Sequence, residues 1–222
     1  GGGASRPPAL LLDAADAVGI EKIFSESGRI CDGGIVDFVR ALCAVSREEM
    51  EAAPDASHTY CMQRIVEVVE ANMDRVRIVW ARMWAVLGPH FERAALEGAS
   101  VERAMFAVDA LRQLAVRFLA KEELEAFHFQ RDFLLPFDHI VAAGRSPELR
   151  ELAVRCVGQA VLSCSPRRVK SGWRVVFKVL TTASRDPAEP VSASAFQLLE
   201  RVAADVFQQI AQDRQSAAAA AA

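Results

Sequence analysis

The residues of this chain that are best suited to chemistry are cations. The stretch RRVKSGWRVVFK, residues 167–178, contains five basic residues and no acidic one. If it is one continuous helix, four of these cations align on a ridge, and like charges at that spacing repel each other. The ridge must therefore be neutralised by acidic side chains of a neighbouring helix or face an acidic partner, and the sequence leaves both open. The ridge would consist of Arg167, Lys170, Arg174 and Lys178, opposite a buried stripe of Trp173, Val176, Phe177 and Leu180. The candidate contact with a partner or an anionic membrane consists of Arg167, Arg168, Lys170, Arg174 and Lys178.

A second group of arginines lies in NMDRVRIVWARMWAVLGPHF, residues 72–91. Trp80 and Trp84 are one turn apart on one side of the expected helix. Its opposite side is apolar too, which predicts a helix buried on two sides. The apolar residues of that opposite side are Ile78, Ala81 and Ala85. We favour a structural role for the arginines, which would bury their stems and reach acidic groups or carbonyl oxygens of neighbouring helices, over partner binding. These second candidates are Arg75, Arg77 and Arg82.

Catalytic and metal-binding motifs are missing from the sequence. There is no Gly-rich phosphate loop, no GxSxG elbow and no HExxH pair, and the four histidines lack metal-ligand spacing. The five cysteines are an odd number without a CxxC pair, which predicts reduced and mostly buried thiols. We therefore predict no catalytic residue, no cofactor and no metal ion.

Composition limits the class of protein. A chain of 222 residues with a formal net charge of −3 is long enough for one domain and does not favour nucleic acid as a partner. The apolar runs are too short to span a membrane and the start lacks the order of a signal peptide, so we expect an intracellular protein. The Gly- and Pro-rich start and the closing alanines predict a flexible leader over residues 1–19, one helical domain over 20–212 and a low-complexity tail over 213–222.

The domain is predicted to be all-α. Apolar residues recur every three or four positions, and strand-like alternation is missing. Two helix starts carry a capping residue followed by proline, at Ser146–Pro147 and at Asp186–Pro187. Ser46 opens a capping-box pattern, SREEM, which predicts the start of a further short helix.

Three of the later helical segments share one apolar rhythm. They begin at Phe106, Leu152 and Ser194, about 46 and then about 42 residues apart. This spacing is typical of HEAT and armadillo repeats, in which helical pairs stack because none can bury its apolar face alone. We therefore predict a HEAT/armadillo-like α-solenoid.

Several motifs together resemble a known family. They are GGIVDFVRALCAVSREEM, YCMQRIVEVVE, NMDRVRIVWARMWAVLGPHF, FAVDALRQLAVRFLAKEEL, FHFQRDFLLPFDHIV, RSPELRELAVRCVGQAV and VKSGWRVVF, in this order over roughly residues 33 to 203. The chain is similar to the first HDS domain (homology downstream of Sec seven) of the large trans-Golgi Arf guanine-nucleotide exchange factors, the brefeldin-A-inhibited class. The resemblance is weaker at residues 31–34 and in the loop at 52–58.

The resemblance implies a regulatory function. The family's catalytic exchange domain has no counterpart here, so the chain is not expected to be an enzyme. HDS domains of this class are associated with autoregulation and with recruitment to Golgi membranes through GTP-bound Arf. The implied partners are GTP-bound Arf, the anionic Golgi membrane surface and neighbouring domains of the same exchange factor, and the implied location is the cytosol and the periphery of the trans-Golgi network.

Two other functions fit part of the pattern. The domain could be an intramolecular spacer or dimerisation scaffold with no contact to Arf or membrane. It could also be a solenoid of the nuclear-transport or phosphatase-scaffold kind that shares only the helical rhythm, although this does not explain so many family motifs in order. Selective binding of GTP-loaded over GDP-loaded Arf would distinguish the regulatory function from a spacer.

Overall fold

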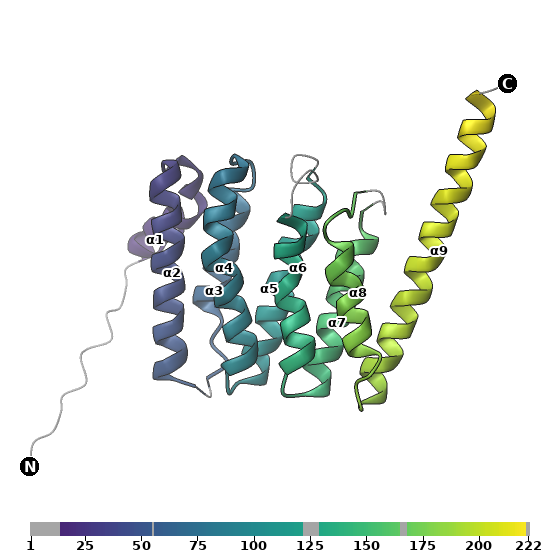
Figure 1. Cartoon of the computed structure of the whole chain (residues 1–222). Helices are drawn as coiled ribbons and strands as arrows, with labels where there is room; N and C mark the ends of the chain where they lie inside the picture. The colour runs from purple at the N-terminus through teal and green to yellow at the C-terminus, as the bar shows by residue number, and fades with distance from the viewer. Residues whose placement is uncertain (1–13, 55, 122–128, 165–167, 221–222) are drawn as a thin grey trace, which may run out of the picture.

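The computed structural model describes residues 14–54, 56–121, 129–164 and 168–220. Every regular element within these ranges is a helix, which confirms the predicted all-α class (Figure 1). The elements are α1 (Ala14–Ser25), the 3₁₀ turn η1 (Ser27–Arg29), α2 (Asp32–Ala52), α3 (Tyr60–Ala71), α4 (Arg77–Glu97), α5 (Val101–Leu119), α6 (Phe129–Ala143), α7 (Pro147–Leu162), α8 (Trp173–Ala183) and α9 (Glu189–Ala220).

The helices form two layers (Figure 1). In the front layer α2 packs against α4, α4 against α6 and α6 against α8. In the layer behind it, α3 packs against α5, α5 against α7 and α7 against α9. Consecutive helices such as α4 and α5, or α6 and α7, also pack together, so the chain crosses between the layers at nearly every turn.

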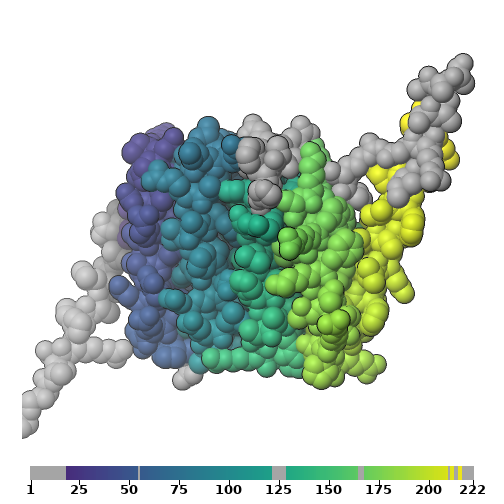
Figure 2. Space-filling view, in the orientation of Figure 1, coloured from purple at the N-terminus to yellow at the C-terminus, as the bar shows by residue number. Residues whose placement is uncertain are grey.

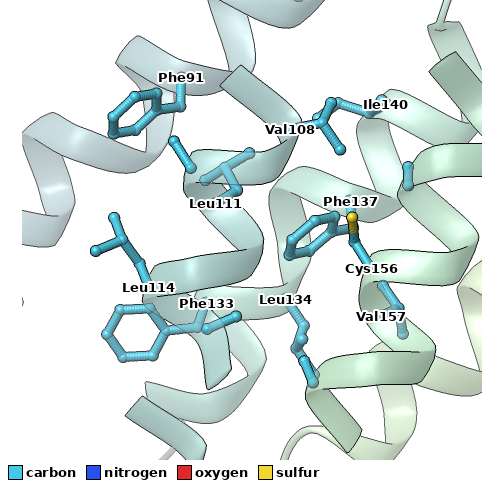
Figure 3. Close-up of a cluster of buried hydrophobic side chains, with 14 of the residues drawn as sticks. Phe91, Val108, Leu111, Leu114, Phe133, Leu134, Phe137, Ile140, Cys156 and Val157 are labelled. Atoms are coloured by element: carbon cyan, nitrogen blue, oxygen red, sulfur yellow. The ribbon is translucent and has the colours of Figure 1, made fainter. Parts of the chain in front are cut away.

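The core lies between the two layers. Figure 3 shows part of it, with Phe91 of α4 and Leu111 of α5 at one end and Phe137 of α6 and Cys156 of α7 at the other. These side chains are almost completely buried. Their helical spacing in the sequence gives each helix an apolar stripe that faces the other layer.

One predicted cap is present, and two predicted helix starts are wrong. The hydroxyl of Ser146 accepts a hydrogen bond from the N–H of Leu149, with Pro147 in the first turn of α7. The second start lies later than predicted, because Asp186 accepts from the N–H of Ala188 and α9 begins only at Glu189. Ser46 starts no helix: it is buried inside α2, which continues because neither Gly nor Pro interrupts its second half.

The helix α4 is buried on one side only, which corrects the prediction of two buried faces. Trp80 and Trp84 lie in the core, where both ring systems meet Phe118 edge-on. Ile78 is 71% exposed and Ala85 is exposed as well. The prediction failed because single apolar residues on a helix often face solvent, so an apolar residue type does not by itself show that a position is buried.

The ends of the domain differ from the predicted boundaries in secondary structure. α1 begins at Ala14, within the predicted leader 1–19, and α9 runs through residues 213–220 of the predicted tail. The division of the chain into leader, domain and tail stays a prediction.

Candidate functional site

The basic stretch is not one continuous helix. α8 begins only at Trp173, and residues 168–172 form a turn, whereas Arg167 lies outside the described residues. Lys170 therefore belongs to the turn, while Arg174 and Lys178 lie on α8. The buried side of α8 consists of Val175, Val176, Val179, Leu180 and Ala183. Phe177, predicted to be buried, is 49% exposed.

The turn before α8 is held by a buried glutamine of α6. The side-chain amide of Gln130 donates to the carbonyl oxygen of Arg168 at 2.6 Å, and its own oxygen accepts from the backbone N–H of Lys170 at 2.8 Å. The Arg168 guanidinium donates to the carbonyl oxygen of Ala120 at 3.1 Å. These hydrogen bonds satisfy backbone groups that a helix would have paired internally, which explains why the helix starts late.

Lys178 forms an ion pair within the domain. Its ammonium lies 2.5 Å from a carboxylate oxygen of Asp138 on α6, and the Asp138 side chain is only 3% exposed. The second oxygen of that carboxylate is buried without a hydrogen-bond partner in the described part of the chain. For Lys178, the structure therefore supports neutralisation by a neighbouring helix over an open position.

Arg75 has the structural role predicted for the second group. It precedes α4, whereas Arg77 and Arg82 lie on that helix. Its guanidinium donates to Asp32 at 2.6 Å, to the carbonyl oxygen of Gly28 at 3.1 Å and to that of Ile30. The hydrogen bonds of Arg75 thus link the turn before α4 to the turn before α2.

The same kind of contact recurs along the edge where these turns meet. Lys121 donates to the carbonyl oxygen of Met73 at 2.5 Å and forms an ion pair with Asp74, and Arg168 donates to Ala120. The sequence separations of the three carbonyl contacts are similar, 45 for Arg75 with Ile30 and 48 for each of the others. Each cation therefore binds the turn one helical pair earlier. Sequence reasoning missed Lys121, although the recurrence of a cation at the spacing predicted for the helical segments was the available signal.

The remaining cations form a basic and apolar surface on the front layer. Arg82 of α4 and Arg174 of α8 are exposed, and neither makes an ion pair or hydrogen bond with another described residue. Arg77 and Lys170 are exposed too, but each has an interaction within the domain. Exposed apolar side chains flank them on the same helices. Arg131 of α6 is exposed as well and lies 3.1 Å from the carboxylate of Asp132. We define the α4–α8 surface as Ile78, Arg82, Arg131, Arg174 and Phe177; Figure 2 views the front layer to which these helices belong.

Three of the described cysteines are buried thiols of low reactivity. Burial raises the pKa of Cys43, Cys61 and Cys156 to about 12, so that their reactive thiolate forms are suppressed. The described ranges hold no group of three His, Cys, Asp or Glu residues that could bind a metal ion. Within the same ranges no helix is long and apolar enough to cross a membrane. The chemistry available on the α4–α8 surface is charge and apolar contact.

The buried His90 predicts a pH-dependent stability. Burial, followed by the charges of Arg47 and Arg93, lowers the pKa of His90 to about 4, from the ordinary value of 6.5. Between pH 6.5 and 4, His90 is therefore protonated in the unfolded chain but neutral in the folded chain. The contribution of His90 to the free energy of unfolding keeps its full value above pH 6.5 and decreases as the pH falls towards 4, by about 3 kcal/mol at most. Urea unfolding at several pH values in this range should show a smaller loss of unfolding free energy for His90→Gln than for the parent chain.

Comparison with known proteins agrees with the resemblance in the motifs. Residues 117–201 match the model of the Sec7-like HDS family, described as Mon2/Sec7/BIG1-like. The match over residues 117–201 is thus to an HDS region and not to a catalytic Sec7 domain. It is 41% identical over 191 residues to brefeldin A-inhibited guanine nucleotide-exchange protein 1 of Mus musculus, and 40% identical over 201 residues to the protein of that name in Arabidopsis thaliana.

The alignments cover most of this chain but little of its relatives. They include 86% and 90% of the chain, and 10% and 12% of the two exchange proteins. The chain thus spans about a tenth of the curated relatives that it matches. That it corresponds to the first HDS domain of such a protein stays a prediction.

Proposed function

We propose that this chain is a non-catalytic regulatory domain of a large Arf exchange factor, which helps recruit that factor to trans-Golgi membranes through GTP-bound Arf and tunes its activity. The observation that carries the proposal is the 41% identity over 191 residues to a brefeldin A-inhibited exchange protein, in a region of the HDS family. The proposed location is the cytosol and the peripheral trans-Golgi network, with a role in vesicle trafficking and protein transport.

The proposed architecture is a HEAT-like α-solenoid. It is supported by the two layers of helices and by the contacts between turns 45 to 48 residues apart. Stacked helical pairs contact mainly their neighbours and leave long side surfaces exposed. Such surfaces suit a domain that binds Arf, membrane and neighbouring domains of one exchange factor without performing chemistry.

The α4–α8 surface is the proposed contact for Arf at the membrane. Arg82 and Arg174 are open to an acidic partner, and Ile78 and Phe177 supply apolar area beside them. Basic side chains near an anionic surface contribute about 1 kcal/mol each, and salt screens this attraction within about 8 Å at physiological ionic strength. Binding at this surface is therefore expected to depend on salt.

The function is tested by comparing the two nucleotide states of Arf. The 222-residue chain should co-sediment with liposomes of phosphatidylcholine and phosphatidylserine when they carry GTP-loaded Arf, and less with GDP-loaded Arf. It should not accelerate nucleotide release from Arf. Equal binding of both nucleotide states would favour the alternative, a spacer or dimerisation scaffold. Binding to the same liposomes without Arf would indicate recruitment by lipid alone.

The double variant Arg82→Glu/Arg174→Glu should weaken this association roughly tenfold at low salt, with a smaller effect as salt rises. Both positions are exposed, so the melting temperature should change little. The matched control is Arg145→Glu/Arg185→Glu, which changes the net charge equally at exposed positions in the turns at the other ends of α6 and α8. An unchanged affinity of the Arg82/Arg174 variant would remove the α4–α8 surface from recruitment.

A further inference from the structure

A groove lies on the opposite side of the molecule from the α4–α8 surface, between α7 and α9. It has a volume of about 930 Å³ and extends to Asp109 and Arg112 of α5. Its α7 side is the exposed face of that helix, with Arg155 and Gln159, and its α9 side includes Arg201. None of the proposed contacts with Arf or membrane involves these residues.

The groove follows the N-terminal half of α9, which packs on α7 and contributes Ser194, Gln197, Leu198 and Arg201 to the lining. α9 has 32 residues and α7 has 16, so α9 is about 24 Å longer. Figure 1 shows α9 leaning away from the two layers towards its C-terminal end. At the floor, Leu198 of α9 lies against Gly158, where an added Cβ would come within 2.9 Å of it. The groove therefore has a close-packed apolar floor between polar walls.

The acidic side chains of the groove already have partners within the domain. Asp109 already accepts from Arg112 at 2.7 Å and from Gln113 at 2.8 Å. Glu151 accepts from the hydroxyl of Ser194 at 3.3 Å and lies 3.8 Å from Arg155. Both carboxylates thus have donors within the domain.

Two guanidinium groups remain available on facing walls. Arg155 is 69% exposed and makes only the long contact to Glu151, and Arg201 is exposed without a partner among the described residues. An occupant would meet apolar side chains of Leu152, Leu162 and Leu198 below and two guanidinium groups beside them. Guanidinium groups bind carboxylates with two parallel hydrogen bonds when both are available.

We propose that the α7–α9 groove is a docking site for an acidic amphipathic helix. The groove runs between two neighbouring helices, as in the helix-in-groove mode of recognition. Its volume corresponds to roughly two turns of a peptide helix about 10 Å in diameter. The apolar side of the bound helix lies over the leucines, and its carboxylates pair with Arg155 and Arg201.

The test uses a synthetic amphipathic peptide with the 222-residue chain. The probe is a 14-residue labelled helix with leucine at helical spacing and glutamate elsewhere, and its match has lysine in place of glutamate. Fluorescence anisotropy should show binding of the acidic probe, weakening with salt, and at least tenfold weaker binding of the basic one. The double variant Arg155→Glu/Arg201→Glu should weaken binding of the acidic probe at least tenfold, and the control Arg145→Glu/Arg185→Glu should leave it unchanged.

A second variant fills part of the groove without changing its charge. Gln159→Trp places a large side chain at an exposed position on the groove wall and should also weaken binding, with little change in melting temperature. The proposal is overturned if the acidic probe does not bind at up to about 1 mM, a free energy of roughly −4 kcal/mol. It is equally overturned if the basic probe binds as well, or if neither the charge-reversal variant nor Gln159→Trp weakens binding.

Discussion

Trp80→Ala should lower the free energy of unfolding by about 3–5 kcal/mol, the range for removing a large aromatic side chain from a core. Trp80 is 1% exposed, and its ring centroid lies 4.5 Å from that of Phe118 in an edge-on arrangement. Its indole N–H donates to the carbonyl oxygen of Met73 at 3.3 Å, which ties α4 to the turn before it. Chemical denaturation would measure the loss.

Ile78→Ala is the matched control for Trp80. It removes apolar atoms from the same helix, but at a position that faces solvent, so the change should stay within about 0.5 kcal/mol. If Trp80→Ala instead folds as stably as the parent and loses only partner binding, Trp80 belongs to a binding surface and the structural role assigned to this helix is wrong.

Lys178→Met should destabilise the domain by about 2–3 kcal/mol, because it leaves the buried carboxylate of Asp138 without its cation. The cost is below the usual 3–5 kcal/mol for breaking a fully buried pair, since Lys178 itself is 63% exposed. Arg174→Met, on the same helix, has no such partner among the described residues and should change stability little.

A double-mutant cycle separates the ion pair from loss of packing. Asp138→Asn removes the buried charge, so adding Lys178→Met to it should cost much less than Lys178→Met alone. Equal effects of Lys178→Met in both backgrounds would show that the pair contributes nothing. This result bears on any charge-reversal study of the basic stretch, since a variant that includes Lys178 would lose stability and binding together.

The sequence alone determined the fold class and the resemblance to HDS regions. Helical spacing of apolar residues is a local property of the chain, and so are Ser146 and Pro147 at the start of α7. The family motifs likewise depend only on residue order, and the comparisons confirmed them over most of the chain. The structural role of Arg75 was also predicted, because a long cation beside a buried helix tends to reach neighbouring carbonyl groups.

Only the tertiary structure decided which cations are available to a partner. Gln130 binds the backbone around Arg168 and so breaks the predicted helix, and Asp138 pairs with Lys178. These contacts join residues 38 to 40 positions apart. Gln130 and Asp138 lie on α6, the preceding front-layer helix, and residue spacing within α8 cannot reveal such partners. The exposure of Phe177 was also decided by packing, because α8 presents Val175 and Val179 to the core and Phe177 lies outside that buried face. The physical reason is that charge pairing and burial depend on which residues the neighbouring helices place opposite each side chain.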